Sequence, residues 1–425
     1  MSTTSSRTHL TDDPALPSRD SLLDPDHVAE RLSRIFDREG SIEQCSLRRA
    51  EYQFGVFIRV VYDVSCDGRP FVITGRTFAA SDREFRRAVA DALPVDGMAA
   101  IAHDEHTDTV WWTLPNDRKL RNLATLIDPP VRVRESSGVA WHQSELVEYS
   151  PERSATVRVL DAHGQVCGFA KAYLDRDALD AADQINHVAA SVVLLDGIRT
   201  PRALGWARPD RIVVLEAMRG RRWSQLPAAG QSPAMTNLGA ALAGIHWLHT
   251  DFGRGTFQRY DQRNVLAAAD LVAQARPDLA EPVRRLGAKL SRASPSRGAT
   301  VCLHGDVHIN NVLFHSDEVH MIHLDKGGSG VASADVGSML ASLMTDRLLD
   351  PDLFGAGLGT SFLEGYGSIH PLPSTAELRW YTAAAFVAER AAGAITTVHV
   401  PTLTVLPEVL AMADGVLAGK VGLED

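Results

Sequence analysis

The fold of this chain is decided by the stretch Leu303-His304-Gly305-Asp306-Val307-His308-Ile309-Asn310-Asn311-Val312-Leu313-Phe314. A second apolar run, residues 320–324, follows it and leads into Asp325. In this order, one carboxylate orients an attacking hydroxyl, while an amide oxygen and a second carboxylate hold Mg²⁺ against nucleotide phosphates. The stretch therefore predicts a catalytic loop with Asp306 and Asn311, followed by a short β-hairpin that ends near Asp325.

Length and charge narrow the classes of function. The chain has 425 residues, 45% of them hydrophobic, so two or three packed units with sizeable cores are expected. Its formal net charge is -10, from 43 basic and 53 acidic side chains. This charge disfavours nucleic acid and anionic membranes as partners and suits a cationic small molecule, although ordinary solubility is the simpler explanation of it. The oligomeric state is not readable from the sequence.

Cysteine usage and the first residues bear on the cellular compartment. The four cysteines lie far apart, with no CxxC pair, and indicate neither a zinc site nor a disulfide framework. Residues 1–24 are rich in Ser, Thr, Asp and Pro and lack an apolar core, so a flexible tail is expected rather than a signal peptide. No apolar run reaches the roughly 18 residues that span a bilayer. A cytoplasmic protein is predicted.

Residues 25–134 are predicted to form an accessory or cap unit of the α+β type. The patterns favour helices at 25–41 and 81–93 and strands within 45–80, including 51–64 and 71–78, and at 98–102 and 109–114. Residues 111–120 place two tryptophans beside a charged turn. Such an arrangement either binds a ligand or staples the edge of a domain.

The remaining chain separates into a β-rich part and a helical part. Residues 135–220 favour strands at 145–149, 156–160, 166–173 and 212–216 and one helix at 179–195. Residues 221–425 favour helices at 237–249, 267–275, 281–290, from 335 onward and at 376–395. The predicted catalytic hairpin interrupts these helices.

Residues 304–313 resemble the HGDxHxxNxL signature of the aminoglycoside phosphotransferase and choline kinase group, which are small-molecule kinases with a protein-kinase-like fold. Further segments are similar to recurrent family segments: Leu238–His249, Asp325, Gly330, Asp335–Leu340 and Phe362–Tyr366. The likeness covers roughly 135–395 and is strongest in the helical part. It implies a two-lobed α+β fold with a β-rich N-lobe and a mainly helical C-lobe, to which residues 25–134 add an extra N-terminal α+β unit.

The resemblance implies roles for the residues of the catalytic stretch. Asp306 is expected to be the catalytic aspartate, which accepts the proton of the substrate hydroxyl. Asn311 and Asp325 are expected to bind Mg²⁺. His304 and His308 are expected to brace the loop rather than bind metal. Asp335 is expected to accept hydrogen bonds from backbone amides near the loop.

The nucleotide side departs from the family pattern. Lys171 resembles the strand lysine that contacts the α and β phosphates of ATP. No Glu lies between Glu152 and Glu216, so the acidic partner of the lysine is assigned to Asp183, with Asp180 as the next candidate and His187 or Gln184 as residues that could intervene. The turn at 150–154 has no glycine, and its backbone amides are expected to reach phosphate with help from Arg153 or Ser154. Backbone groups around Glu216 and Met218 are expected to contact adenine. Lys326, next to Asp325, either stabilises transferred charge or pairs with an acid.

Three functions follow from these residues. The first is an ATP- and Mg²⁺-dependent O-phosphotransferase that acts on a hydroxyl of an aminoglycoside, an amino sugar or a sugar-like molecule. The second is a kinase-like enzyme that phosphorylates Ser or Thr of a peptide in natural-product biosynthesis, with 25–134 as a docking module. The third is a non-catalytic nucleotide-binding pseudokinase. The candidate polar linings of the acceptor pocket are Glu364, Glu389, Arg390 and His399.

Overall fold

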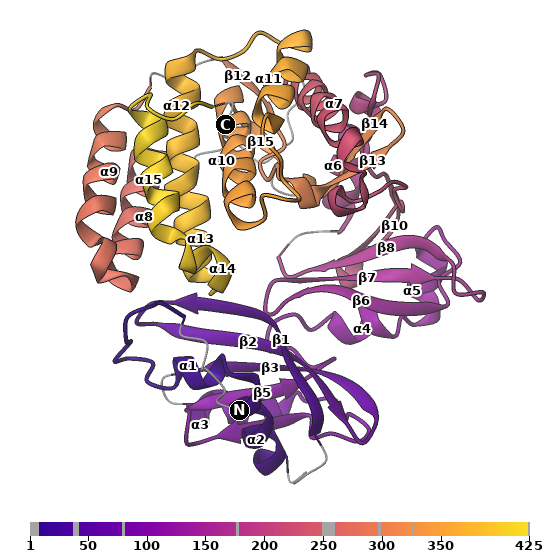
Figure 1. The fold of residues 1–425 in the computed structure, drawn as a ribbon. Coiled ribbons are helices and arrows are strands. Elements are labelled where there is room, and N and C mark those ends of the chain that lie inside the picture. Colours follow the sequence, from indigo (N-terminus) through magenta and orange to yellow (C-terminus); the bar gives the residue numbers. More distant parts are fainter. Residues whose placement is uncertain are drawn as a thin grey trace. The chain divides into compact units, whose positions relative to one another are not determined.

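The protein forms two compact units in a computed structural model that describes residues 8–36, 42–78, 81–175, 178–248, 260–295, 299–324 and 327–423 (Figure 1). Unit 1 comprises Met1–Ala181, Leu204–Leu215 and Ile395–Val398. Unit 2 comprises Ala182–Ala203, Glu216–Ala394 and His399–Asp425. Sheets dominate the first unit and helices the second, as the predicted fold class requires. The predicted accessory unit at 25–134 lies in the same compact unit as most of the predicted N-lobe strands.

The first sheet of unit 1 is antiparallel, with the strand order β1-β2-β3-β5-β4. Its strands are β1 (Ile42–Gln53), β2 (Phe57–Cys66), β3 (Arg69–Thr77), β4 (Ile101–Asp104) and β5 (Thr109–Thr113). The helices in this region are α1 (Arg19–Leu22), α2 (Pro25–Ile35) and α3 (Ser81–Ala90). The single strand predicted at 51–64 is wrong. Gly55 has a left-handed φ of 69° and the Val56 N–H donates to the Gln53 carbonyl, so a tight turn divides this stretch between β1 and β2.

The second sheet of unit 1 has the order β10-β11-β8-β7-β6. Its strands are β6 (Gln143–Ser150), β7 (Ser154–Leu160), β8 (Val166–Tyr173), β10 (Ala203–Ala207) and β11 (Ile212–Leu215). Helices α4 (Leu123–Ile127) and α5 (Val131–Ser136) precede it and α6 (Ala178–Val192) follows β8. Strand β10 and the two short helices were not predicted, because their few residues carry too little periodicity.

The two sheets of unit 1 share one hydrophobic core. Val61 of the first sheet belongs to the same buried cluster as Tyr149 and Val157 of the second. Trp111 and Trp112 are fully buried, and the indole N–H of Trp112 lies 3.4 Å from the Tyr149 hydroxyl. Trp112 therefore links the two sheets, which favours stapling over ligand binding as the interpretation of this segment.

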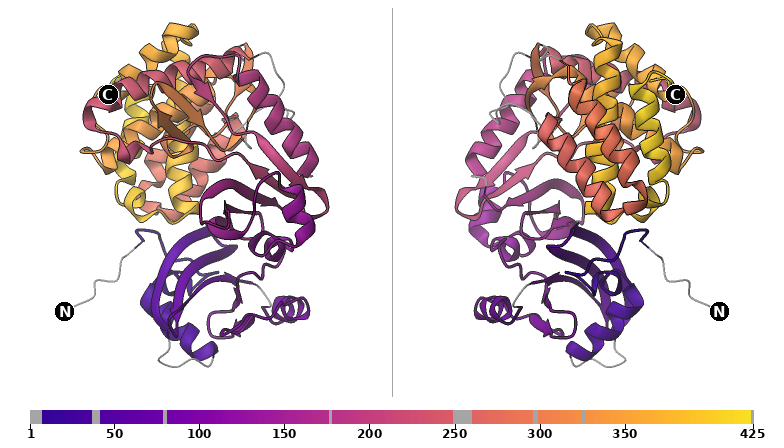
Figure 2. Two further views of the ribbon diagram at one scale, coloured as in Figure 1. Left: turned by 90° about the vertical axis from the view of Figure 1, so that its right-hand side faces the viewer. Right: turned by 90° about the vertical axis from the view of Figure 1, so that its left-hand side faces the viewer.

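Unit 2 is mainly helical, and its orange and yellow helices pack side by side (Figure 2). The helices are α7 (Ala228–Trp247), α8 (Gln262–Ala275), α9 (Ala280–Arg292), α10 (Ala332–Leu349), α11 (Leu358–Ile369), α12 (Thr375–Ala385), a π-helix (Phe386–Ala391), α13 (Ala392–Thr396), α14 (Val400–Thr404) and α15 (Leu406–Leu417). Helix α7 begins at Ala228 rather than at the predicted residue 237. None of the helices in the described ranges has the length and apolarity that a membrane crossing requires.

Short strands in unit 2 frame the predicted catalytic stretch. β12 (Thr300–Leu303) pairs with β15 (Gly328–Val331), and β13 (Val312–His315) pairs with β14 (Glu318–Met321). β9 (Ile198–Arg199) adds a parallel strand to β14. The predicted hairpin after Asn311 is therefore present. Residues 304–311 connect β12 to β13, so both ends of this loop are fixed by strand pairing.

Candidate active site

The loop at 304–311 begins with a sharp backbone turn at Gly305, whose φ of 77° favours glycine. Asp335, near the start of α10, holds this turn. Its carboxylate accepts the His304 N–H at 2.7 Å and the Gly305 N–H at 3.0 Å. The prediction that Asp335 binds backbone amides is confirmed. Two successive amides aimed at one buried carboxylate fix the direction in which the chain enters Asp306.

The His304 ring braces the same loop from inside. Its Nδ1 accepts the Asp306 N–H at 3.3 Å, and its Nε2 donates to the Ile322 carbonyl at 3.1 Å. This pair of bonds requires the neutral ring with its proton on Nε2. Burial lowers the pKa of His304 and outweighs the nearby carboxylates Asp335 and Asp306, which raise it. The predicted bracing role of His304 is confirmed, while that of the His308 side chain stays a prediction.

Asp306 and Asn311 lie together at the two ends of the loop. The Asn311 side-chain N–H₂ donates to the Asp306 carbonyl at 2.8 Å and lies 3.3 Å from the Asp306 Oδ2. Asp306 is half-buried and Asn311 is buried. Because the amide nitrogen of Asn311 faces Asp306, its amide oxygen is the atom left for a hard cation. The donor chemistry of Asn311 therefore fits Mg²⁺.

The chain on either side of Asp325 is tied to the loop. The Ile322 N–H donates to the Asn311 carbonyl at 2.9 Å, and Gly328 pairs with Leu303 in the β12–β15 ladder. His323 adopts a left-handed φ of 64°, which is uncommon for a residue with a side chain. Asp325 and Lys326 themselves lie outside the described residues, so their assigned roles stay predictions. Within the described ranges, no three His, Cys, Asp or Glu side chains gather as a metal site.

Behind Asp335 lies a buried layer that sequence reasoning missed. His246 on α7 places Nε2 3.4 Å from Asp335 Oδ2 and Nδ1 2.7 Å from the Tyr366 hydroxyl on α11. Burial raises the pKa of Tyr366, so its hydroxyl stays protonated. His246 belongs to the segment Leu238–His249 that resembles the family, and the last residue of this segment, His249, lies outside the described residues. A histidine within an apolar helix carries no local signal of such a contact.

Lys171 and Asp183, the predicted pair of the nucleotide side, belong to different compact units. Lys171 lies on β8 opposite Thr156, it is buried, and its ammonium is 5.4 Å from the centroid of the Tyr173 ring. Asp183 is exposed on α6. Their pairing therefore stays a prediction.

The backbone amides of the glycine-free turn between β6 and β7 are less available for phosphate binding than expected. The Glu152 N–H, one of the amides predicted to reach phosphate, donates to Asp117 Oδ2 at 2.8 Å. Arg153 keeps 64% of its side chain exposed and lies 3.6 Å from Glu51. Ser154 opens β7 and pairs with Ser150 and Tyr173. Of the groups in this turn that are predicted to contact phosphate, the Arg153 guanidinium is the most exposed to solvent.

The predicted adenine contacts lie where the chain passes from unit 1 to unit 2, between Leu215 and Glu216. The Glu216 N–H donates to the Arg202 carbonyl at 2.8 Å. Its carboxylate accepts from the Arg202 guanidinium at 3.0 Å, which lowers the pKa of Glu216. Glu216 is therefore fixed by Arg202, and the contact of Met218 with adenine stays a prediction.

Two of the four candidate acceptor residues form a network with α10. Glu389 and Arg390 lie on the π-helix. Glu389 accepts from the hydroxyls of Tyr260 and Ser338, the latter at 2.6 Å, and Arg390 lies 3.3 Å from the Ser342 hydroxyl. By contrast, Glu364 is exposed on α11 and His399 caps the start of α14.

Polar residues continue along one face of α10 from the catalytic loop. Asp335, Ser338, Ser342 and Asp346 recur at helical spacing. The last of them, Asp346, accepts from Ser342 at 3.1 Å, and burial raises its pKa. A stripe of acids and hydroxyls therefore connects the loop at Asp335 with the Glu389 network.

Sequence comparison identifies one protein family. Residues 130–381 match the model of the phosphotransferase enzyme family (APH). No protein with a curated description matches the chain.

Three solved structures illustrate what the chain is similar to. Aminoglycoside phosphotransferase APH(3'')-Id from Streptomyces rimosus is 20% identical, with 67% of this chain and 98% of that chain covered and a TM-score of 0.41. Macrolide 2'-phosphotransferase MphH from Brachybacterium faecium is 15% identical, with coverage of 64% and 91% and a TM-score of 0.42. The amicoumacin kinase hAmiN with AMP-PNP is 12% identical, with coverage of 70% and 96% and a TM-score of 0.46.

Proposed function

The chain belongs to the phosphotransferase enzyme family, and we propose that it is an ATP- and Mg²⁺-dependent kinase of small polar molecules. The acceptor is a hydroxyl of an aminoglycoside, an amino sugar or a sugar-like compound. The observation that carries this proposal is the loop at 304–311, in which Asp335 holds two backbone amides and Asn311 contacts Asp306. Because these contacts already hold the loop, its groups need no reorganisation when the reaction takes place.

Asp306 is the residue that receives the proton. Half-buried at the end of a fixed turn, its carboxylate accepts a hydrogen bond from the acceptor hydroxyl and orients the oxygen for in-line attack. The nearby Asn311 N–H₂ stabilises the charged carboxylate before the proton moves. Asn311 through its amide oxygen and Asp325 through its carboxylate would hold Mg²⁺, which neutralises phosphate charge when bound.

The nucleotide contacts are proposed on the second sheet and the segment that follows it. Lys171 reaches the α and β phosphates, with Asp183 as its acidic partner, and Arg153 with Ser154 contacts phosphate from the turn. The backbone around Glu216 and Met218 contacts the adenine edge. The position of Lys171 supports this role, because the residue is buried on β8, in the same sheet as the strands β6 and β7 that flank the turn at 150–154.

A cationic acceptor is supported by the stripe along α10. The carboxylates and hydroxyls of this stripe extend from the loop at 304–311 along α10, where Ser338 contacts Glu389 and Ser342 contacts Asp346. Both acids are partly buried, and carboxylates bind ammonium groups through charge-assisted hydrogen bonds. The net charge of -10 favours the same class of acceptor.

The proposal is tested by incubating the protein with Mg²⁺ and ATP against panels of aminoglycosides, amino sugars and neutral sugars, with ADP release as the first readout. Mass spectrometry of each positive reaction then identifies a product heavier by one phosphate. A parallel panel of Ser- and Thr-containing peptides measures the competing acceptor class. Phosphorylation confined to peptides would contradict the proposed acceptor, and a lack of ATP binding would contradict the proposed reaction.

A further inference from the structure

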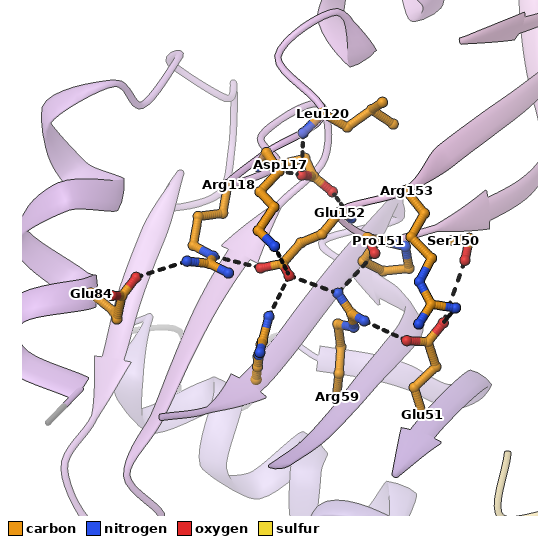
Figure 3. Close-up of polar contacts among 12 residues, drawn as sticks. Glu51, Arg59, Glu84, Asp117, Arg118, Leu120, Ser150, Pro151, Glu152 and Arg153 are labelled. Atoms are coloured by element: carbon orange, nitrogen blue, oxygen red, sulfur yellow. Dashed lines mark hydrogen bonds and ion pairs between the residues drawn. The ribbon is translucent and has the colours of Figure 1, made fainter. Parts of the chain in front are cut away.

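The hairpin turn at 150–154 is held by residues of the first sheet of unit 1. The tip of a turn is ordinarily exposed, because connecting segments run over the surface. Glu152 at this tip is only 4% exposed, although its backbone has a left-handed φ of 62°. Its side chain points toward Arg59 and Arg118, which come from β2 and from the segment after β5 (Figure 3).

Four cations surround the Glu152 carboxylate. Arg118 Nε lies 2.5 Å from Oε1, Arg59 Nη1 lies 3.0 Å from Oε2, and Lys119 Nζ lies 3.8 Å from Oε2. Arg76 on β3 pairs with the same Oε2. Burial raises the pKa of Glu152, but the arginines outweigh burial and hold the pKa below its ordinary value. The carboxylate is therefore charged and serves as the shared counter-ion of the cluster.

The backbone of the turn is bound as well. The Glu152 N–H donates to Asp117 at 2.8 Å, and Arg59 donates to the Pro151 carbonyl at 2.8 Å. Asp117 is fixed in its turn, because it accepts the Tyr149 hydroxyl at 2.6 Å and the Leu120 N–H at 2.7 Å. The turn is thus held through both its side chain and its main chain.

Two further carboxylates complete the arrangement. Glu51 on β1 pairs with Arg59 and lies 3.6 Å from Arg153, and Glu84 on α3 accepts from Arg118 at 3.1 Å. Each arginine that contacts Glu152 from β2 or after β5 is therefore itself held by a second acid. Figure 3 shows this chain of contacts from Glu84 through Glu152 to Glu51.

We infer that the first sheet is a positioning clamp for the nucleotide-binding turn, and that Glu152 is the positioning residue through which the clamp acts. The inference rests on the proposed function, in which the turn contacts nucleotide phosphate. A glycine-rich loop binds phosphate through mobile backbone amides. Here the Glu152 N–H already donates to Asp117, so it is not available to phosphate and the turn is rigid. Phosphate is therefore bound by the exposed guanidinium of Arg153.

The test compares Glu152→Gln with the wild type in the full-length protein. The substitution keeps the shape of the side chain but removes the shared counter-ion. Hydrogen exchange should become faster at the Glu152 and Arg153 amides. The affinity for Mg²⁺·AMP-PNP, measured by calorimetry, should fall by about tenfold or more, the loss expected when one hydrogen bond between charged groups is weakened. The matched control is Glu148→Gln on β6, the strand that leads into the turn, because its carboxylate is half exposed and lies 3.9 Å from Arg49 at the edge of the cluster.

The outcomes are separable. Unchanged exchange at the turn in Glu152→Gln, or faster exchange with unchanged nucleotide affinity, would overturn the clamp. A wild-type protein that fails to bind Mg²⁺·AMP-PNP would instead overturn the proposed function. Should Glu152→Gln fail to fold, Arg118→Gln removes one partly exposed arm of the clamp and is expected to shift both readouts in the same direction.

Discussion

At the scale of single residues, the site depends on side chains that hold backbone rather than on side chains that touch substrate. His304, Asp335 and Asn311 together bind four backbone groups at the three consecutive loop positions 304–306. The Asp306 carboxylate lies 3.3 Å from the side-chain nitrogen of Asn311. The residue assigned to chemistry is thus placed by its neighbours.

Asp306→Asn is expected to reduce phosphoryl transfer by at least two orders of magnitude, because the amide cannot take up the hydroxyl proton. Steady-state kinetics on the acceptor found in the screen measures the effect. Asp317→Asn, on the exposed turn between β13 and β14, is the matched control and should leave the rate unchanged. Equal rates in the two variants would contradict the assignment of Asp306.

His304 gives the stability of the protein a dependence on pH. Its folded pKa is lowered, so the unfolded chain binds the proton more readily than the folded chain. The stability that depends on neutral His304 is present above the ordinary pKa near 6.5 and is lost as the pH falls below it. Urea unfolding at pH 7.5 and pH 5.5 should therefore show a smaller loss of unfolding free energy in His304→Gln than in the wild type. A loss of the same size in both proteins would argue against this role.

At the scale of elements, the layer beneath the catalytic loop depends on close helix packing. A Cβ added at Gly239 on α7 would overlap the Phe362 carbonyl of α11, and one at Gly365 on α11 would overlap Thr236 of α7. These glycines let the two helices approach closely. The approach brings His246 of α7 to Tyr366 of α11 and thereby supports Asp335.

Gly239→Ala is expected to lower the free energy of unfolding by about 1–3 kcal/mol, because the helices must separate to admit the methyl group. Gly230→Ala, on the same helix, adds a Cβ at an ordinary contact distance of 3.5 Å from Pro227 and should be neutral or slightly stabilising. Thermal and urea unfolding of both variants make the comparison. A Gly239→Ala protein as stable as Gly230→Ala would show that the crossing is not tight.

At the scale of the whole molecule, unit 1 behaves as one body in spite of its two sheets. The shared cluster around Val61, the contact between Trp112 and Tyr149 and the charged cluster around Glu152 all join the first sheet to the second. Breaking a buried ion pair by removing one partner costs about 3–5 kcal/mol, so the two sheets are expected to unfold together.

Val61→Ala tests this cooperativity. The substitution should lower the stability by about 2 kcal/mol and accelerate hydrogen exchange in β6–β8 as well as in β1–β3, because it opens a cavity in the common core. Val56→Ala, a residue 58% exposed in the turn before β2, is the matched control and should change the stability by less than about 0.5 kcal/mol. Faster exchange limited to the first sheet would show two independent cores.

The sequence alone determined the catalytic loop, the hairpin after it and the division into β-rich and helical parts. The contacts of Asp306 with His304 and Asn311 join residues at most five positions apart, so local spacing sets them. The turn at Gly55, the strand β10 and the short helices escaped prediction because so few residues leave a weak pattern.

Only the tertiary structure decided what supports the loop and the nucleotide-binding turn. His246 meets Tyr366 across 120 positions of sequence, and Arg76 meets Glu152 across 76. Such pairs depend on the angle at which two helices cross and on the register of the strands in sheets that share a core. Both are determined by many weak contacts acting together. The local sequence does not specify which distant residues these contacts bring together, so the buried charge cluster around Glu152 can be identified only in the folded structure.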